Sequence, residues 1–217
     1  MVPGPNPSGV GDHFDTSRLE AFSDGVFAIA ITLLVLEISV PEDQFDDLLA
    51  GILDQWPSYL AYLTSFLTIG GVWLVHHGII RRMRYADVWF VRANLLLLLF
   101  VSFLPFPTKL VAEAIAIASA ERVAVLFYGA TLLAISAIVS AMGRYVADRE
   151  GLRAEGVSSR DLRTVVALAE PSLGFYGALL VSAIFVPQIA AFGLLAVAAL
   201  ALTLPPQLVR RRMRRVT

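Results

Sequence analysis

The fold is decided by residues 18–37, which read RLEAFSDGVFAIAITLLVLE. Residues 22–40 are apolar enough to cross a bilayer, and as a helix they span about 28 Å, close to the hydrocarbon thickness. We expect Thr16 or Ser17 to cap the start of this helix and Pro41 to close its end. The stretch therefore predicts a first membrane-spanning helix that opens with Arg, Ser and Asp side chains.

A helical wheel divides this segment into two faces that point in different directions and must therefore have different roles. One face, about 100° wide, holds Arg18, Phe22, Gly25, Ile29, Thr32, Leu33 and Leu36. We call Ile29, Leu33 and Leu36 the apolar stripe, which suits close approach to a copy of itself or a narrow path. Asp24 lies on the opposite side, and Ser23 lies between the two faces. Since an acid inside a membrane normally faces protein or water, we expect Asp24 to meet another helix of its own bundle.

The opening of this helix carries a motif that is uncommon at the start of a membrane span. Arg18 to Asp24 has the form R-x-x-x-F-S-D, and Thr32 follows eight residues after the Asp. This pattern resembles the signature of the endosomal/lysosomal-type potassium channel family (transmembrane protein 175), in its prokaryotic single-repeat form. The resemblance extends over the chain in span count and length. The motif occurs once, so the chain carries no internal duplication of it.

Composition indicates a polytopic helical membrane protein. Hydrophobic residues make up 57% of the 217 residues, charged residues only 16%, and mean hydropathy is +0.72, unlike a soluble domain. The lack of cysteine excludes disulfides and Cys-based metal sites. Residues 1–17 are rich in Pro and Gly and lack an apolar core, so we expect a flexible tail rather than a cleavable signal peptide.

Six apolar segments predict an all-α fold with six transmembrane helices. They are 19–40, 56–78, 88–107, 122–143, 162–186 and 188–206. With both termini cytoplasmic, all of the 17 basic residues except Lys109 and Arg122 fall inside, as the positive-inside rule requires. The predicted organisation is a cytoplasmic tail (1–17), a six-helix channel domain (18–206) and a basic cytoplasmic tail (207–217). The resemblance places this multi-pass protein in the plasma membrane of a prokaryote.

The resemblance implies a potassium-permeable cation channel, a homotetramer with the first helices around the pore. One copy of the apolar stripe cannot enclose a path, so several chains must contribute, usually with closed cyclic symmetry. The resemblance makes Ile29 the narrowest constriction, Leu33 and Leu36 further apolar rings, and Thr32 a polar contact that favours potassium. An apolar ring can gate by excluding water. Periodicity alone favours ordinary core packing for the stripe, and the motif reverses that preference.

Glu37 and the acidic residues of the first loop lie at the expected outer end of the pore. Segment 41–55 contains five acids and no base. Repeated by symmetry, these carboxylates would concentrate cations at the pore mouth. An ordinary solvated loop explains the acids equally well, whereas Glu37 has the stronger claim because it belongs to the first helix.

The resemblance implies that Arg18, Phe22, Ser23 and Asp24 support the pore helix through neighbouring helices and do not bind the permeating ion. Their candidate partners are Trp73, His76 and His77 on the second predicted helix, and Arg92 and Asn94 on the third. Trp73 and His77 are four residues apart and share a helix face. A buried polar network is therefore expected, because buried polar groups normally require partners.

No metal site, enzyme or cofactor is predicted, apart from the permeating potassium ion. His76 and His77 are adjacent, so their side chains point about 100° apart and make poor joint ligands, although a pH response stays open. Phosphate loops, dinucleotide-binding turns and nucleophile elbows are absent from the sequence. The Arg-rich C-terminal tail follows a membrane span, so contact with anionic lipid is expected rather than nucleic acid.

A secondary transporter for a small solute or proton is the alternative function. It would use Glu170, beside the kink expected at Pro171, together with the His pair of a single chain. Such transporters usually contain internal repeats, and none is visible here. A membrane scaffold without transport is a third possibility. We also expect Pro105 and Pro107 to end the third helix at the outer face.

Overall fold

The computed structural model describes residues 13–114, 117–167, 174, 176–178 and 181. Across these residues the chain forms α-helices, joined by short 3-10 helices (η) and two isolated β-bridges. The elements are α1 (Thr16–Leu33), η1 (Leu34–Glu37), η2 (Glu42–Asp47), α2 (Leu48–Asp54), α3 (Trp56–Ile80), α4 (Val88–Phe103), α5 (Pro105–Ala114), α6 (Ala118–Asp148), η3 (Glu150–Leu152) and α7 (Ser159–Val166).

Four helical stretches of the described residues are long and apolar enough to cross a membrane. They are Thr16–Glu37, Trp56–Ile80, Val88–Ala114 and Ala120–Asp148. These stretches match the first four predicted segments, so the all-α membrane fold is confirmed. The fifth predicted segment, 162–186, is described only in part, and the sixth, 188–206, lies outside the described residues.

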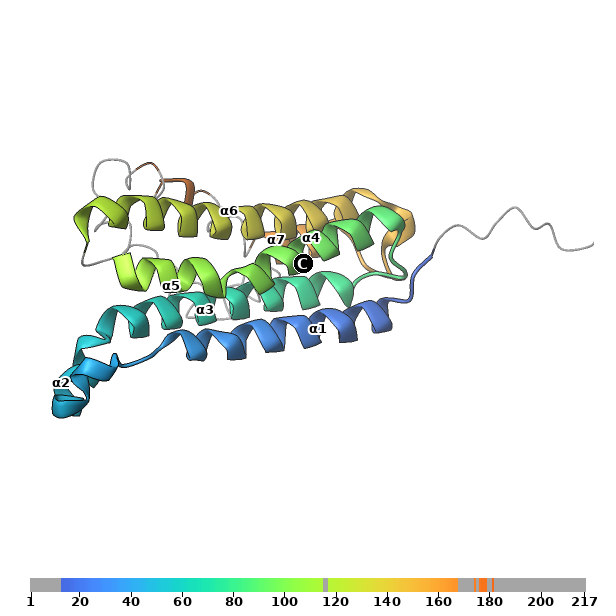
Figure 1. The fold of residues 1–217 in the computed structure, drawn as a ribbon. Helices are drawn as coiled ribbons and strands as arrows, with labels where there is room; N and C mark the ends of the chain where they lie inside the picture. Colours follow the sequence, from blue (N-terminus) through green and yellow to red (C-terminus); the bar gives the residue numbers. More distant parts are fainter. Residues whose placement is uncertain (1–12, 115–116, 168–173, 175, 179–180, 182–217) are drawn as a thin grey trace, which may run out of the picture.

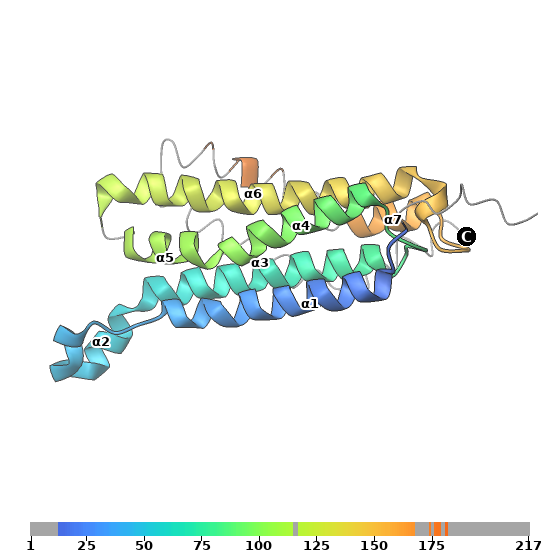
Figure 2. The ribbon, with the colours of Figure 1, turned by 45° about the vertical axis from the view of Figure 1, so that its right-hand side comes forward.

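The long helices lie side by side in an elongated bundle (Figure 1). Helix α1 lies at one edge of the bundle and packs against α3 and α4, while α5 and α4 both contact α6 (Figures 1 and 2). Helix α2 lies at one end of the bundle. The start of α1, helix α7 and the turns after α3 and α6 lie at the opposite end. The ends of the first helix are therefore far apart along the bundle axis, as a membrane-crossing helix requires.

One apolar core holds the bundle together, with buried side chains from every long helix. Phe27, Ile69, Leu97 and Leu132 are each no more than 1% exposed. Lipid tails are as apolar as these side chains, so the packing gains its stability from close van der Waals contact more than from escape from water. A shape mismatch at a helix contact should therefore be costly.

The start of α1 differs from the sequence prediction. Asp15, rather than Thr16 or Ser17, caps the helix, and its carboxylate accepts a hydrogen bond of 2.7 Å from the Ser17 backbone N–H. Thr16 is already the first helical residue. Phe14 forms a short antiparallel bridge with Ala86 through two backbone hydrogen bonds of 2.8 and 3.0 Å. This bridge ties the chain just before α1 to the α3–α4 turn.

The third span continues beyond the point where the sequence analysis expected it to end. Helix α4 stops at Phe103, but α5 begins at Pro105 and continues to Ala114 in line with α4 (Figure 1). Pro105 and Pro107 were expected to end the third helix, and α4 does end just before them, but they do not end the span because both prolines occupy the first turn of α5. A first-turn residue has no intrahelical partner for its N–H, so proline is tolerated there.

Candidate functional site

The described residues leave the predicted apolar stripe of α1 uncovered. Ile29 is 60% exposed, Leu33 42% and Leu36 71%, whereas Phe27 and Leu34, on the other side of the helix, are buried. Exposed aliphatic side chains in a membrane-spanning helix face lipid, another copy of the chain or a path. The stripe therefore lies outside the core that the described helices form.

Thr32 lies on the same uncovered face as the stripe. Its hydroxyl donates a hydrogen bond of 2.9 Å to the backbone carbonyl of Ile29, one turn earlier. A threonine hydroxyl has one proton and two lone pairs. Because the proton is used within the helix, the lone pairs of the oxygen are the part of Thr32 that can face a cation.

Glu37 ends η1 at the C-terminal end of the first span, close to a basic residue of α5. Its Oε2 lies 3.7 Å from Nζ of Lys109, and both side chains are partly exposed. An exposed ion pair of this kind adds little stability, on the order of 0–1 kcal/mol. Its local effect is to offset the negative charge of Glu37 at the end of the helix.

A buried polar triad joins α1, α3 and α4. Asn94 donates from Nδ2 to Oγ of Ser23 at 3.0 Å, and its Oδ1 lies 2.7 Å from Nε2 of His76. All three side chains are fully buried. Asn94 Oδ1 can only accept, so we assign the proton of a neutral His76 to Nε2. The triad links three helices at one level of the bundle, and each helix contributes one member.

A second polar group lies on the flank where α1 meets α3. Trp73 donates from Nε1 to Oδ1 of Asp24 at 2.8 Å, and its ring stacks on that of His77 with centroids 5.5 Å apart. Nδ1 of His77 lies 2.8 Å from Oε1 of Glu20. One ligating atom from each of Glu20, Asp24 and His77 lies within 4.8 Å of the other two. We call these three residues the α1–α3 cluster.

Glu20 was missed by the sequence analysis, although its spacing from Asp24 was informative. Residues four apart share one helix face, so Glu20 and Asp24 had to lie side by side. His76 and His77 do not act together, since His76 faces Asn94 and His77 faces Glu20. Arg18 and Phe22 are exposed near the N-terminal end of α1.

The other expected participants lie away from these groups or outside the described residues. Arg92 is exposed on α4, whereas Trp73 is the residue that hydrogen-bonds to Asp24. Glu170 and Pro171, on which the transporter hypothesis depends, lie outside the described residues.

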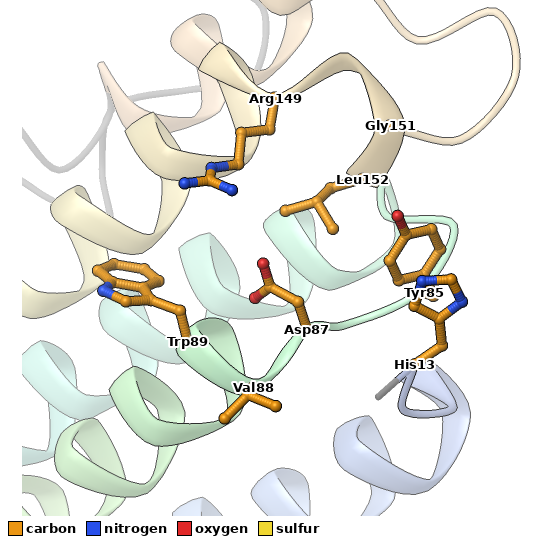
Figure 3. Close-up of a pocket in the computed structure, with 8 residues that line it drawn as sticks. All are labelled: His13, Tyr85, Asp87, Val88, Trp89, Arg149, Gly151 and Leu152. Carbon is orange, nitrogen blue, oxygen red and sulfur yellow. The ribbon is translucent and has the colours of Figure 1, made fainter. Parts of the chain in front are cut away.

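A pocket of about 480 Å³ opens at the end of the bundle where α1 begins (Figure 3). Asp87 lies at its centre, with Trp89 and Arg149 on one side and His13 and Tyr85 on the other. The Asp87 carboxylate accepts hydrogen bonds from the Phe90 backbone N–H and the Tyr145 hydroxyl. Its lining residues are His13, Tyr85, Asp87, Val88, Trp89, Arg149, Gly151 and Leu152. One carboxylate oxygen caps the start of α4 and the other bonds to Tyr145 of α6, so Asp87 has a structural role here.

Together, these features define a multi-pass helical membrane protein whose first helix is anchored on one side and left exposed by the described residues on the other. Residues 18–105 match the family model described as endosomal/lysosomal potassium channel TMEM175. A protein of Chamaesiphon minutus named as a potassium channel is 40% identical over 179 residues, which cover 81% of this chain and 85% of the relative. The chain therefore belongs to the TMEM175 family, whose members are ion channels and not enzymes.

Two further comparisons concern a solved structure and a vertebrate relative. The crystal structure of a lysosomal potassium-selective channel TMEM175 homolog from Chamaesiphon minutus has a TM-score of 0.75 and 36% sequence identity. The match covers 86% of this chain and 95% of that one. A Danio rerio protein named endosomal/lysosomal proton channel TMEM175 is 42% identical over 105 residues, which cover 44% of this chain but only 20% of the relative.

Proposed function

We propose that this chain is a potassium-permeable channel subunit and that α1 lines the pore. The observation that carries the proposal is the uncovered apolar stripe on the helix that begins with the R-x-x-x-F-S-D motif. The name of the Chamaesiphon minutus relative supports potassium as the permeating ion. We place the channel in the plasma membrane of a prokaryote, since that relative and the solved homolog are both bacterial.

In this proposal, Ile29 forms the narrowest ring of the pore, and Leu33 and Leu36 form rings about 6 and 12 Å further out along the helix, since Leu36 lies in 3-10 helix η1. An apolar ring excludes water until it widens, and it offers no oxygen to replace an ion's hydration shell. The more weakly hydrated potassium ion therefore passes at lower cost than sodium. The Thr32 oxygen, between the first two rings, adds the one polar contact of this stretch.

The pore requires several chains, and we propose a homotetramer. Each subunit has six spans, with both termini in the cytoplasm. The distribution of charge along the bundle supports this orientation. The basic turns after α3 and α6 lie at the end where α1 starts, and acidic η2 lies at the other end (Figure 1).

The two polar groups support the pore helix by fixing its rotation. The triad of Ser23, His76 and Asn94 holds α1 from inside the bundle, and Trp73 holds Asp24 on the α3 flank. Both attachments lie in the inner half of α1, so the apolar stripe further out is aimed at a common axis. If α1 turned about its own axis by the angle between successive residues, about 100°, Ile29 would no longer face the pore axis.

Purified protein in liposomes with a potassium gradient tests the position of the constriction. Replacing Ile29→Asn should raise potassium flux and reduce the preference over sodium, because a polar ring stays hydrated. The matched control is Leu99→Asn, a 63%-exposed aliphatic residue on α4. Flux and ion preference unchanged by Ile29→Asn would remove Ile29 from the constriction.

The number of chains around the axis is tested by cross-linking. The chain contains no cysteine, so Ile29→Cys introduces a single thiol. Oxidation should join subunits in pairs within a tetramer, whereas Leu99→Cys should join them far less. A monomer that transports in liposomes would instead favour the transporter hypothesis. Because the vertebrate relative is named a proton channel, the same liposomes should carry a pH-sensitive dye to measure proton flux.

A further inference from the structure

We propose that the α1–α3 cluster, formed by Glu20, Asp24 and His77, binds one divalent transition metal ion, for which Zn²⁺ is the natural probe. The site lies between the first and second spans, on the flank of α1 away from the apolar stripe. It is separate from the path proposed for potassium. Binding itself does not depend on the proposed function.

The distances in the cluster suit a small metal ion. Tetrahedral zinc with bonds of about 2.0–2.2 Å holds its ligand atoms roughly 3.3–3.6 Å apart. In the cluster, the His77 Nδ1 to Glu20 Oε1 distance is 2.8 Å, and all three ligating atoms lie within 4.8 Å of one another. Small side-chain rotations therefore bring the three atoms to bonding distance. All three side chains are partly exposed, which leaves the fourth position open to water.

The close contact between His77 and Glu20 indicates that a positive charge lies between the two side chains. Nδ1 of His77 is shielded from solvent, and in the described part of the chain it makes no well-aligned hydrogen bond, although Oε1 of Glu20 is close. A nitrogen lone pair and a carboxylate oxygen repel each other at 2.8 Å unless a proton or a metal lies between them. A poorly aligned proton is a weak bridge, whereas a metal ion can satisfy both atoms at once.

The negative charge of the two carboxylates in the α1–α3 cluster also favours a bound divalent ion. Glu20 and Asp24 are two carboxylates on one face of a membrane-spanning helix, where like charges one turn apart repel and water screens them poorly. A proton on His77 offsets one of these charges, and a divalent ion offsets both. Because one ligand is an imidazole, the set favours zinc, cobalt and similar ions over magnesium, calcium or potassium.

Trp73 holds the ligands in place. It donates to Oδ1 of Asp24, which leaves Oδ2 to face the ion, and its ring stacks on His77. Partners of this kind orient metal ligands and contribute to affinity. A chance pair of exposed carboxylates on a helix has no residue that orients it. Trp73 orients both Asp24 and His77, and this preorganisation distinguishes the cluster from such a pair.

Binding is measured on the full-length protein in detergent, after removal of any histidine tag. Zinc titration by calorimetry should give one site per chain with micromolar affinity, and cobalt should produce a visible absorption band that zinc abolishes. Glu20→Gln and His77→Gln should each weaken binding at least tenfold. The controls are Glu155→Gln and His13→Gln, which change an exposed acid and an exposed histidine elsewhere.

Zinc-edge X-ray absorption of the unmodified protein gives a second measurement that needs no variant. It should report one nitrogen and two carboxylate oxygens among the ligands, with bonds near 2.0–2.2 Å. The proposal is overturned if zinc does not bind, or if both ligand variants bind as tightly as the controls. An ion coordinated by other atoms would also overturn it, and the plain His77–Glu20 ion pair would then explain the contact.

An effect on transport rests on the proposed function. A metal ion that joins α1 to α3 would restrain the rotation of α1, so zinc should reduce potassium flux in liposomes, and Glu20→Gln should relieve the reduction. Zinc binding without a change in flux would leave the site intact and count against α1 as the moving pore helix. Flux without zinc binding would leave the pore proposal intact and remove the site.

Discussion

Asn94 on α4 and His76 on α3 are joined by a hydrogen bond of 2.7 Å between two fully buried side chains. The same Asn94 donates to Ser23 on α1. One amide therefore satisfies a polar group on each of two other helices, in a part of the bundle from which water is excluded. Such a group is far more costly to remove than its own net contribution suggests.

Replacing Asn94→Leu should destabilise the folded protein by about 2–5 kcal/mol, because Ser23 and His76 each lose a partner while staying buried. The measurement is the thermal unfolding midpoint in detergent, read from the loss of the gel-filtration peak. Ser102→Ala on the same helix is the control, since Ser102 is exposed and bonds only to the backbone of its own turn. Equal midpoints for the two variants would show that the triad does not stabilise the bundle.

Helix α7 packs closely against α6 at Gly143, and a substitution there measures how much space this contact leaves. A Cβ atom at this position would clash with Cγ2 of Val166 and lie 3.1 Å from Cδ1 of Ile79. Gly143→Ala should therefore force α7 away from α6 and cost about 1–3 kcal/mol, despite the better helix propensity of alanine. Gly70→Ala is the matched control, because nothing lies within 4 Å of the added atom.

The clash at Gly143 has a specific remedy. The double variant Gly143→Ala with Val166→Ala removes the atom that the new methyl group would meet. It should recover part of the lost unfolding midpoint, and Val166→Ala alone should lower it. If the double variant were less stable than the sum of the two single changes predicts, the source of the effect would lie elsewhere.

The capping box at the start of α7 predicts a pH dependence outside the membrane spans. Hydrogen bonds from the backbone N–H and hydroxyl of Ser158 hold the pKa of Asp161 below its ordinary value of 3.8. A group whose folded pKa is lowered stabilises the structure above its unfolded pKa, and that contribution is lost as the pH falls through the folded value. Helix α7 should therefore loosen under acid conditions, below about pH 4.

Hydrogen exchange of residues 159–166 between pH 3 and 6 measures this loss, after correction for the intrinsic rate. In the unmodified chain, protection should fall toward the acid end. In Asp161→Ala, protection should be lower at pH 6 and should change less with pH. Ser158→Ala should also reduce protection, by an amount equivalent to about 0.5–2 kcal/mol for a lost N-cap. A protection profile in Asp161→Ala that matched the unmodified chain would exclude this carboxylate as the source.

Sequence reasoning located the first four spans and the two faces of α1, because both depend on local sequence patterns. Asp24 and Ile29 cannot share a face, whatever surrounds the helix. The fourth span illustrates the limit, since its boundaries were expected at 122–143 but α6 runs from Ala118 to Asp148. Hydropathy identifies the apolar centre of a helix, whereas its ends depend on local hydrogen bonds and packing.

The contacts between helices were less accessible to sequence reasoning. The wheel identified candidate partners for Asp24 but could not decide between Trp73 and Arg92, because that choice depends on how α3 and α4 are rotated. Pro105 was expected to end a helix, but the start of α5 at the same residue was not foreseen, because proline both ends helices and begins them. The pairing of Glu37 with Lys109 similarly depends on the continuation of the third span into α5.

The Glu37–Lys109 pair lies at the outer end of the proposed pore, where its charge should affect cation entry. Lys109 lies 3.7 Å from the Glu37 carboxylate and offsets its charge. Lys109→Met should leave that charge uncompensated in every subunit, raise the local cation concentration and increase potassium flux. Glu37→Gln should lower the flux instead. Both effects should be largest near 10 mM salt and should fade near 1 M, where the screening length shrinks from about 30 Å to about 3 Å.

Lys109→Arg is the control, because it keeps the positive charge and should leave flux near that of the unmodified channel. The pair is partly exposed, so neither charge change should lower the free energy of unfolding by more than about 1 kcal/mol, and the unfolding midpoint should change little. This separates an electrostatic effect on permeation from damage to the fold. If Lys109→Met and Glu37→Gln changed the flux in the same direction, or if the changes were equal at both salt concentrations, charge at this position would not control cation entry. The outer mouth would then have to be assigned to residues other than Glu37.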